Sequence, residues 1–486
     1  MLSIAVIIIL CHTVNAQKRE LDIDSCRSLA VQNNYALKKA KARQRVSHYQ
    51  TKAAFTNFLP KLSAAGTYQR TQKEISLLND EQKYDLSHIG TTGSKHIEQM
   101  LAENPSLAGQ LAPFMPVLTG MESSLNQLGN GLVDALRTDT RNMAAVGAIL
   151  TQPLYVGGKI TAYNNITHYA EKLAQSQYSL CEEEVILNAD KAYWTVVSLV
   201  NKKKLADNYL KLLKKLDNDV YKMIEQGIAT KAEGLSVDVK LNEAEMALLQ
   251  VENDLSLSKM LLCQICGIPL DTDIMLYDEK MDNLPMTSYE MDGKNNDFVS
   301  EALSRREELK SLDIVNEIYR QKIKIARSEF LPNLALTGGY LLTNPSIYNG
   351  FENKFRGNWT VGVTLTMPIF HWGEGVYKVK AAKAEAIIKQ YEWEDAREKI
   401  ELEINQNSYK LTEARKKLET SVKNLEKAEE NLRHAELGMN EGVIPVSNVL
   451  EAQTAWLSAH TDKIGAQIDL RLADLYLQKS LGKLNH

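Results

Sequence analysis

The sequence has few prolines, few aromatic residues, almost no net charge and no long apolar run after its first residues. Lys and Arg number 57 against 61 Asp and Glu, and this balance argues against a nucleic-acid partner. Aromatics are only 7% of the chain, while Ala, Leu, Lys and Glu are plentiful, which favours long helices. After residue 9 no apolar stretch approaches the ~20 residues that a spanning helix needs, so a membrane span would have to consist of strands.

Sequence patterns of catalytic sites are also missing. The nine histidines form no HExxH motif, no nucleophile elbow occurs, and Gly157-Gly158-Lys159 lacks the spacing of a phosphate loop. Cys263 and Cys266 are spaced as a CxxC pair, but they lie in a helical pattern with no second pair of ligands. We interpret them as small apolar helix residues or an incidental bridge, and we predict no enzyme activity, catalytic residue, metal or cofactor.

The N-terminus has the pattern of an export signal. Residues 2–10 are apolar, and Val14-Asn15-Ala16 places small residues at positions −3 and −1 of a cut before Gln17. Lipidation at Cys11 is the alternative, although Leu10 is bulky for the residue before a lipidated cysteine. We predict a signal peptide at residues 1–16.

The absence of proline from residues 154–268 and 369–444 permits very long helices. Within the second gap, apolar residues from Leu411 to Ala435 recur every three or four positions, with Lys, Glu and Arg between them. The pattern predicts long helices at 158–226, 231–267, 374–440 and 446–483, and shorter helices at 21–57 and 298–329. A single long helix does not bury its own stripe, so these helices need partners.

Punctuating residues show that the chain repeats itself. Phe58-Leu59-Pro60 recurs as Phe330-Leu331-Pro332, and the Leu-Thr-x-Pro pattern that ends at Pro153 recurs with its end at Pro368. The second of these spacings also relates Gly227 to Gly442 and Gly267 to Gly482. We predict two repeats, 17–267 and 298–486, joined by a polar connecting segment at 268–297. The two Phe-Leu-Pro motifs lie farther apart than the two Leu-Thr-x-Pro motifs, which places an insertion at 71–141 of the first repeat.

Two strands are predicted in each repeat, at 61–70, 142–152, 333–342 and 358–368. The last alternates Trp359, Val361, Val363 and Leu365 with glycine and threonine, as in a barrel strand with lipid on one side and water on the other. Four strands cannot close a membrane barrel, because unpaired edges are prohibitive in lipid. More than one copy must therefore contribute, and three copies would give 12 strands.

Candidate functional residues follow from these elements. The strand–helix junctions are predicted at Pro60, Pro153, Pro332 and Pro368. Aromatics near the strand ends are predicted to form interfacial belts; they are Phe58, Tyr155, Phe330, Trp359, Phe370 and Trp372. Tight turns between antiparallel helices are predicted at Gly227-Ile228-Ala229-Thr230 and Gly442-Val443-Ile444-Pro445. Simple helix punctuation and ordinary packing are the alternatives for the prolines and the aromatics.

Several of these segments resemble the TolC-like outer-membrane efflux proteins. The stretch from Glu441 to Gln453 is similar to the family's signature at a tip turn, and Phe-Leu-Pro-x-Leu at 58 and 330 resembles its junction motif, as does Pro-Ile-Phe-His-Trp-Gly at 368–373. The resemblance implies a mostly α fold with a membrane β-barrel, in which a homotrimer builds one 12-strand barrel in outer-membrane lipid and a long α-helical tunnel in the periplasm.

The resemblance also implies a function and partners. A duct of this family would export drugs, metals or polypeptides passively, in a tripartite efflux or type I secretion system, with a periplasmic adaptor docked at the tip turns and an inner-membrane pump. Acidic residues often line the tunnel's constriction, and Glu429, Glu430 and Glu436 are the candidates here, although Arg433 and His434 lie among them. The insertion at 71–141 falls in an extracellular loop, where we hypothesise a partly helical cap over the barrel mouth. A periplasmic coiled-coil scaffold is the alternative function.

Overall fold

The computed structural model describes residues 19–484 apart from 73, 75, 105–108, 110–111, 137–138, 281–294, 347 and 349–351. The predicted signal peptide and much of the connecting segment therefore lie outside the described residues. The chain divides into two units. A helical unit comprises Met1–Lys52, Ala162–Ile323 and Tyr377–His486, and a strand unit comprises Ala53–Thr161 and Lys324–Val376.

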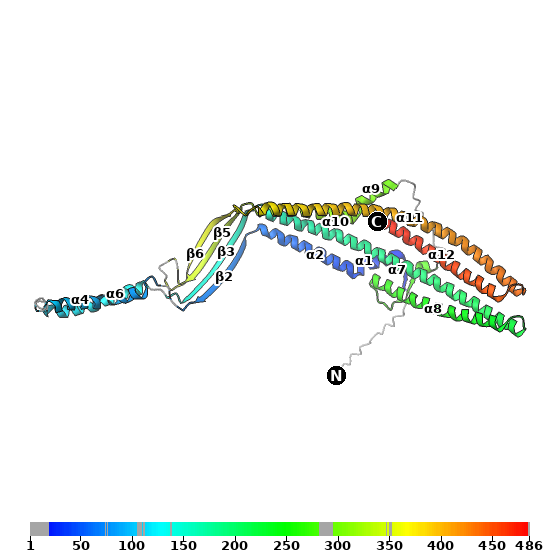
Figure 1. The fold of residues 1–486 in the computed structure, drawn as a ribbon, viewed down its shortest axis with the longest axis horizontal. Coiled ribbons are helices and arrows are strands. Elements are labelled where there is room, and N and C mark those ends of the chain that lie inside the picture. Colours follow the sequence, from blue (N-terminus) through cyan, green and yellow to red (C-terminus); the bar gives the residue numbers. More distant parts are fainter. Residues whose placement is uncertain are drawn as a thin grey trace, which may run out of the picture. The chain divides into compact units, whose positions relative to one another are not determined.

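Two pairs of long helices dominate the helical unit (Figure 1). The first pair is α7 (Lys159–Glu225) and α8 (Lys231–Cys266), and the second is α11 (Glu374–Asn440) and α12 (Val446–Ser480). Both α7 and α11 have 67 residues, which corresponds to about 100 Å at ~1.5 Å per residue. Their lengths follow from the absence of proline, because an internal proline would cost about 3 kcal/mol.

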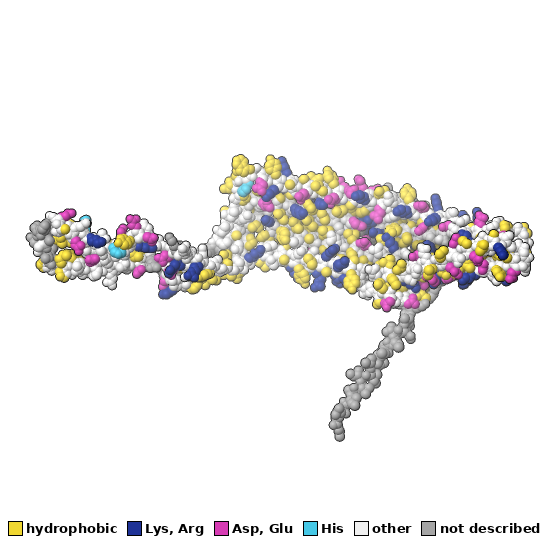
Figure 2. Space-filling model, turned by 60° about the horizontal axis from the view of Figure 1, so that its bottom comes forward, with side chains coloured by type: hydrophobic (Ala, Val, Ile, Leu, Met, Phe, Trp, Pro, Cys, Tyr) yellow, Lys and Arg dark blue, Asp and Glu magenta, His cyan; other side chains and the backbone are white. Residues whose placement is uncertain are grey.

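The apolar stripes of these helices meet in buried clusters. One cluster joins all four long helices through Leu213, Val237, Leu432 and Val449. A second packs α11 and α12 against the short helices α9 (Asn295–Arg305) and α10 (Glu307–Ser328). Figure 2 shows charges of both signs scattered over the surface of this unit, as expected for helices that bury one face and leave the other in water.

The two shorter predicted helices are each broken in two, which corrects the sequence prediction. Residues 21–57 form α1 (Ile23–Asn33), α2 (Tyr35–Phe55) and a 3₁₀ turn, η1 (Thr56–Phe58). Asn34 causes the break, because its extended backbone ends α1 while its Oδ1 accepts from the Ala36 amide at 2.8 Å. In the second repeat Arg306, which the spacing between the two Phe-Leu-Pro motifs relates to Asn34, separates α9 from α10.

Part of the connecting segment belongs to the core. Strand β4 (Ile274–Leu276) pairs in parallel with β1 (Arg19–Leu21), and the short helix η3 (Tyr277–Lys280) follows. Ile274 and Leu276 are fully buried in a cluster with Cys26, Cys263 and Cys266. The prediction of a polar segment is thus wrong for these residues, whose alternating apolar side chains are typical of a strand. The four described cysteines are free thiols, so the bridge alternative is wrong too.

Backbone conformation repeats with the spacing that separates the two Leu-Thr-x-Pro motifs. Gly158, Gly227 and Gly267 have φ values of 81°, 74° and 65°, and their counterparts Gly373, Gly442 and Gly482 have 82°, 73° and 67°. Helices α7 and α11 begin at equivalent positions of the two repeats and end at equivalent positions as well. Left-handed backbone favours glycine, so each pair marks the same turn in both halves.

The strand unit holds one antiparallel sheet of four strands in the order β2-β3-β5-β6. The strands are β2 (Lys61–Arg70), β3 (Asn142–Val156), β5 (Asn333–Asn344) and β6 (Arg356–Thr366). Among the described residues β2 and β6 each pair on one side only, so the sheet has two open edges. Of the helices in the described part of the chain, none is both long and apolar enough to cross a membrane.

The insertion between β2 and β3 is a packed helical hairpin. It contains α3 (Asp80–Ser87), α4 (Ile89–Glu103), the short η2 (Ala112–Phe114) and α6 (Met115–Ala135). Two glycines let the backbones touch: a Cβ at Gly90 would lie 2.2 Å from the Glu122 carbonyl oxygen, and one at Gly129 would lie 1.8 Å from that of Leu86. Asn126 of α6 accepts hydrogen bonds from the Gly90 and Thr91 amides at 2.8 and 3.2 Å, which satisfies free donors at the start of α4.

Candidate functional site

The sheet separates its side chains into an apolar face and a small, hydroxyl-rich face. Strand pairing aligns Leu365 with Leu334, Val363 with Leu336, and Trp359 with Tyr340, and residues paired in this way point to the same side. The same face continues through β3 and β2 with Val146, Leu150, Leu62 and Tyr68. All of these side chains except the half-buried Leu334 are exposed, so the single chain leaves the apolar face of the sheet uncovered.

The opposite face is made of different residues. On β6 it carries Asn358, Thr360, Gly362, Thr364 and Thr366. Lys61, Ser63, Thr67 and Gln69 contribute to it from β2. Ile149 and Leu341 are its exposed large apolar residues. This face suits water, whereas the apolar face suits lipid.

The predicted junction prolines flank strand ends at three of four places. Pro60 and Pro332 immediately precede β2 and β5, and Pro368 lies just after β6. Pro153 is the exception and corrects the prediction, because it lies inside β3, which continues to Val156. The pairing of β3 with β5 shifts register between Pro153 and Tyr155, and such an irregularity accommodates a residue that has no amide hydrogen to donate.

The aromatic residues fall at the two ends of the sheet. Trp359, Tyr340 and Tyr68 lie toward the ends of the strands that lead into the insertion. The predicted residues Phe58, Tyr155, Phe330, Phe370 and Trp372 lie toward the other ends. Phe370 and Trp372 are strongly exposed and contact each other with ring centroids 4.9 Å apart. Trp372 has a φ of 50° at the position equivalent to Gly157, so a bulky side chain is held out at a turn.

Both predicted tip turns adopt the same hydrogen-bonded form. The Ile228 amide donates to Met223 at 2.8 Å, and the equivalent Val443 amide donates to Gly438 at 2.8 Å. Thr230 and Glu233 then form a capping box that starts α8, and Pro445 is the N-cap residue of α12. Ile228 and Val443 are exposed, so each turn presents an apolar side chain to solvent.

Substituting Gly442 tests the left-handed turn. Gly442→Ala has open space around its new methyl but forces a non-glycine residue to φ 73°, so we expect a loss of about 1 kcal/mol in the free energy of unfolding. Gly465→Ala, within α12 and equally uncrowded, is expected to add roughly 0.5–1 kcal/mol. Unfolding in detergent, followed by circular dichroism, measures both. Stabilisation by both changes would contradict the turn's role.

Two of the three candidate constriction acids have basic partners on their own chain. Glu430 bonds to Arg433 at 2.6 and 2.9 Å, and this guanidinium lowers the pKa of Glu430 to about 2. Glu429 lies 3.3 Å from Nε2 of His460. Glu436 is half-buried. Burial lowers the pKa of His460, so its imidazole is neutral at neutral pH and does not offset the charge of Glu429. The guanidinium of Arg433 does offset the negative charge of Glu430, and the position of these acids at a tunnel constriction stays a prediction.

Comparisons with known proteins decide the family. The sequence profile described as "Outer membrane efflux protein" matches residues 26–267 and 298–483, which is most of the chain and both repeats. The chain belongs to the outer membrane efflux protein family. It is therefore an outer-membrane efflux channel protein, a transport duct by family, located in the outer membrane.

Individual relatives of this efflux protein agree with the family. It is 22% identical over 353 residues to the outer membrane protein TolC of Vibrio cholerae, covering 71% of this chain and 78% of the relative. The fold matches the outer membrane protein VceC of Vibrio cholerae with a TM-score of 0.70 at 15% identity, covering 95% of this chain and 96% of VceC. The CmeC outer membrane channel of Campylobacter jejuni matches with a TM-score of 0.70 at 16% identity, covering 95% and 85%.

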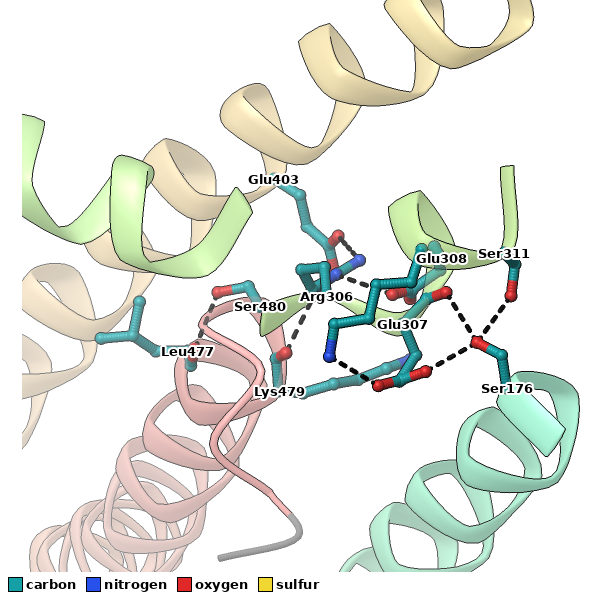
Figure 3. A network of polar contacts seen from close by, with 10 residues as sticks. Ser176, Arg306, Glu307, Glu308, Ser311, Glu403, Leu477, Lys479 and Ser480 are labelled. Carbon is teal, nitrogen blue, oxygen red and sulfur yellow. Dashed lines mark hydrogen bonds and ion pairs between the residues drawn. The ribbon is translucent and has the colours of Figure 1, made fainter. Parts of the chain in front are cut away.

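A buried polar cluster in the helical unit of this efflux protein was not predicted (Figure 3). Arg306, at the break between α9 and α10, forms ion pairs with Glu308 at 3.0 Å and Glu403 at 2.9 Å. Its guanidinium also donates to the Lys479 carbonyl of α12 at 3.3 Å. The side chain is 6% exposed, so one largely buried cation links α10, α11 and α12 through hydrogen bonds and ion pairs.

Glu183 lies beside this cluster and gives it a pH dependence. Burial, followed by repulsion from Glu308, raises the pKa of Glu183 to about 7. The Glu183 carboxyl of the folded protein therefore keeps a proton that the unfolded chain loses near pH 4.5. As a result, the free energy of unfolding falls as the pH rises from 4.5 to 7. Between pH 5 and 7.5 this fall in the free energy of unfolding is on the order of 2 kcal/mol, and we expect it to disappear in Glu183→Gln. Denaturant unfolding at the two pH values measures it. Exposed Glu184→Gln is the control, and an unchanged pH slope in Glu183→Gln would contradict the account.

The equivalence of the two repeats offered a signal for the Arg306 cluster, which the sequence analysis missed. Asn34 donates to the Ile265 carbonyl of α8 at 3.4 Å, and Arg306 occupies the equivalent break and reaches the end of α12. The register therefore relates Arg306 to a helix-breaking position. Nothing in the spacing indicates that the distant Glu403 of α11 supplies its counter-charge.

Proposed function

We propose that three copies of the chain assemble into one passive exit duct, with a closed 12-strand barrel in the outer membrane and a helical tunnel in the periplasm. The supporting observation is the four-stranded sheet with open edges at β2 and β6 and an exposed apolar face. In lipid every open edge leaves backbone groups unpaired, at a cost of several kcal/mol for each group. Pairing β6 of one copy with β2 of the next removes both edges.

The two faces of the sheet support the same arrangement. A ring of such sheets would turn Leu62, Val363 and their aligned neighbours toward lipid, and the threonine-rich face toward the lumen. The exposed aromatics at the two strand ends would then lie at the two membrane interfaces, where amphipathic rings are favoured. Four strands from each of three copies give the 12 strands.

Conductance tests this duct directly. The mature protein, purified from outer membranes and added to a planar lipid bilayer, should open water-filled pores of a single conductance class. Because no chemical step drives passage, the current should need neither nucleotide nor any other energy source. Protein that enters the bilayer and never conducts would overturn the proposal.

We also propose that the two tip turns bind a periplasmic adaptor, which links the duct to an inner-membrane pump. Exposed Ile228 and Val443 at the equivalent turns support this docking. Ile228→Asp and Val443→Asp together should abolish export from cells while leaving the bilayer conductance of the purified protein unchanged. Exposed Glu441→Asp is a control that keeps both. Normal export by the double variant would contradict tip docking.

A further inference from the structure

The hairpin inserted between β2 and β3 carries an exposed apolar stripe that its own fold does not cover. The stripe runs along α6 and onto the capping residue at each of its ends, and it comprises Phe114, Val117, Met121, Leu125, Leu128, Leu132 and Leu136. All seven side chains are between 40 and 65% exposed. Figure 2 shows hydrophobic side chains at the surface of this hairpin, which Figure 1 labels α4 and α6.

The spacing of the stripe is that of a helix packed along its whole length. The steps between successive members are 3, 4, 4, 3, 4 and 4, an 11-residue repeat of about 3.67 residues per turn. Such a repeat keeps a stripe almost parallel to the helix axis, so another helix could contact all seven side chains.

The remaining surface of α6 is already used or polar. Its packed face, with Asn126 and Gly129, is fixed against α3 and α4 by the contacts described above. Glu122 of that face accepts a hydrogen bond from Thr91 at 2.9 Å. The other flank carries Ser123, Gln127 and other polar residues. The stripe is therefore exposed although the described helices α3, α4 and α6 pack against one another.

Charge distinguishes the possible occupants of the stripe. Helix α6 has no Lys or Arg from Met115 to Ala135, whereas helices that lie on a membrane surface are rich in both. Its acidic residues, Glu122 and Asp134, lie off the stripe. Identical copies of the stripe therefore meet without like-charge repulsion, which favours a second copy of the same helix over an anionic lipid surface.

Chain connectivity brings the copies together. The insertion leaves from Arg70 at the end of edge strand β2 and returns at Asn142 at the start of β3. In a closed ring of sheets, β2 would lie at the interface between adjacent copies. Each insertion would therefore lie next to the adjacent copy, and all insertions would lie at the same end of the ring. Symmetry would make the α6 helices parallel and in register.

We propose that the α6 helices of one assembly pack against each other through this stripe and form a parallel helical bundle over the outer mouth of the duct. The inference rests on the proposed multi-copy duct and identifies the contact that its inserted hairpins make. It deepens the hypothesis of a cap, because the cap becomes a self-associating element that narrows the exit.

Cysteine cross-linking of the full-length protein tests the bundle. In a Cys181→Ser background, which removes the half-buried thiol, Leu128→Cys places a thiol on the stripe and Gln127→Cys places one on the polar flank. A short bis-maleimide should link Leu128→Cys chains into dimers, with one chain of each trimer left over, and should leave Gln127→Cys chains single. Met121→Cys should behave like Leu128→Cys.

The stoichiometry of the same samples separates the possible failures. If native mass shows several copies but Leu128→Cys and Met121→Cys stay single, the bundle is wrong while the duct stands, and lipid or another protein covers the stripe. Equal linking of Gln127→Cys and Leu128→Cys would also overturn the bundle. A single copy by native mass would remove the proposed duct and the bundle together.

Discussion

Val363→Lys is expected to remove the protein from the outer membrane, whereas Thr364→Lys next to it is expected to leave assembly intact. Val363 lies on the apolar face of β6, opposite Leu336, and is exposed in the single chain. A lysine on the lipid side near the bilayer midplane costs about 2–4 kcal/mol per chain, and in the proposed barrel three copies would multiply that cost. Fractionation of membranes and immunoblotting measure the effect.

Thr364→Lys is the matched control, because it adds the same charge to the other face of the same strand. In the proposed duct its ammonium group would enter the water-filled lumen, so the purified variant should still conduct and its ion selectivity should shift toward anions in reversal-potential measurements. Normal outer-membrane levels of Val363→Lys, or loss of Thr364→Lys alone, would show that the two faces have been assigned the wrong way round.

Arg306→Met is expected to destabilise the helical unit by about 3 kcal/mol. The substitution keeps most of the side-chain volume but leaves Glu308 and Glu403 without their counter-charge and the Lys479 carbonyl without its donor. Both carboxylates are about one-third exposed, so water offsets part of the penalty and the estimate lies at the low end of the usual range.

Arg305→Met is the control for that experiment. Arg305 is the neighbouring residue, 42% exposed, and its ion pair with Glu301 lies on the helix surface. Such pairs contribute about 0–1 kcal/mol, so its removal should scarcely move the unfolding midpoint in detergent. Equal effects of the two substitutions would mean that the buried cluster is not what holds α10 to α11 and α12.

The repeats and the sheet illustrate how much of this fold the sequence predicts. Glycines that need a left-handed backbone and prolines that interrupt helices leave local signals, so their paired spacings identified the tip turns. Alternation on β6 likewise separated its two faces, because side chains in a strand point to opposite sides by geometry alone. In each case the physical cause lies within a few residues of the signal.

The parts that sequence did not predict depend on distant contacts. Asn34 and Arg306 break helices in cooperation with carbonyl groups of α8 and α12 that lie far away along the chain. Pro153 lies within a strand because a register shift against β5 accommodates it. The close packing of Gly129 on Leu86 also depends on how two helices cross, which apolar periodicity does not specify.

The number of chains in the purified assembly tests the central claim most directly. Native mass spectrometry of the mature protein in detergent should give three times the mass of one chain, because only neighbouring copies can pair the open edges of β2 and β6. A stable single chain that keeps its sheet in lipid, with β2 and β6 unpaired, would contradict the account.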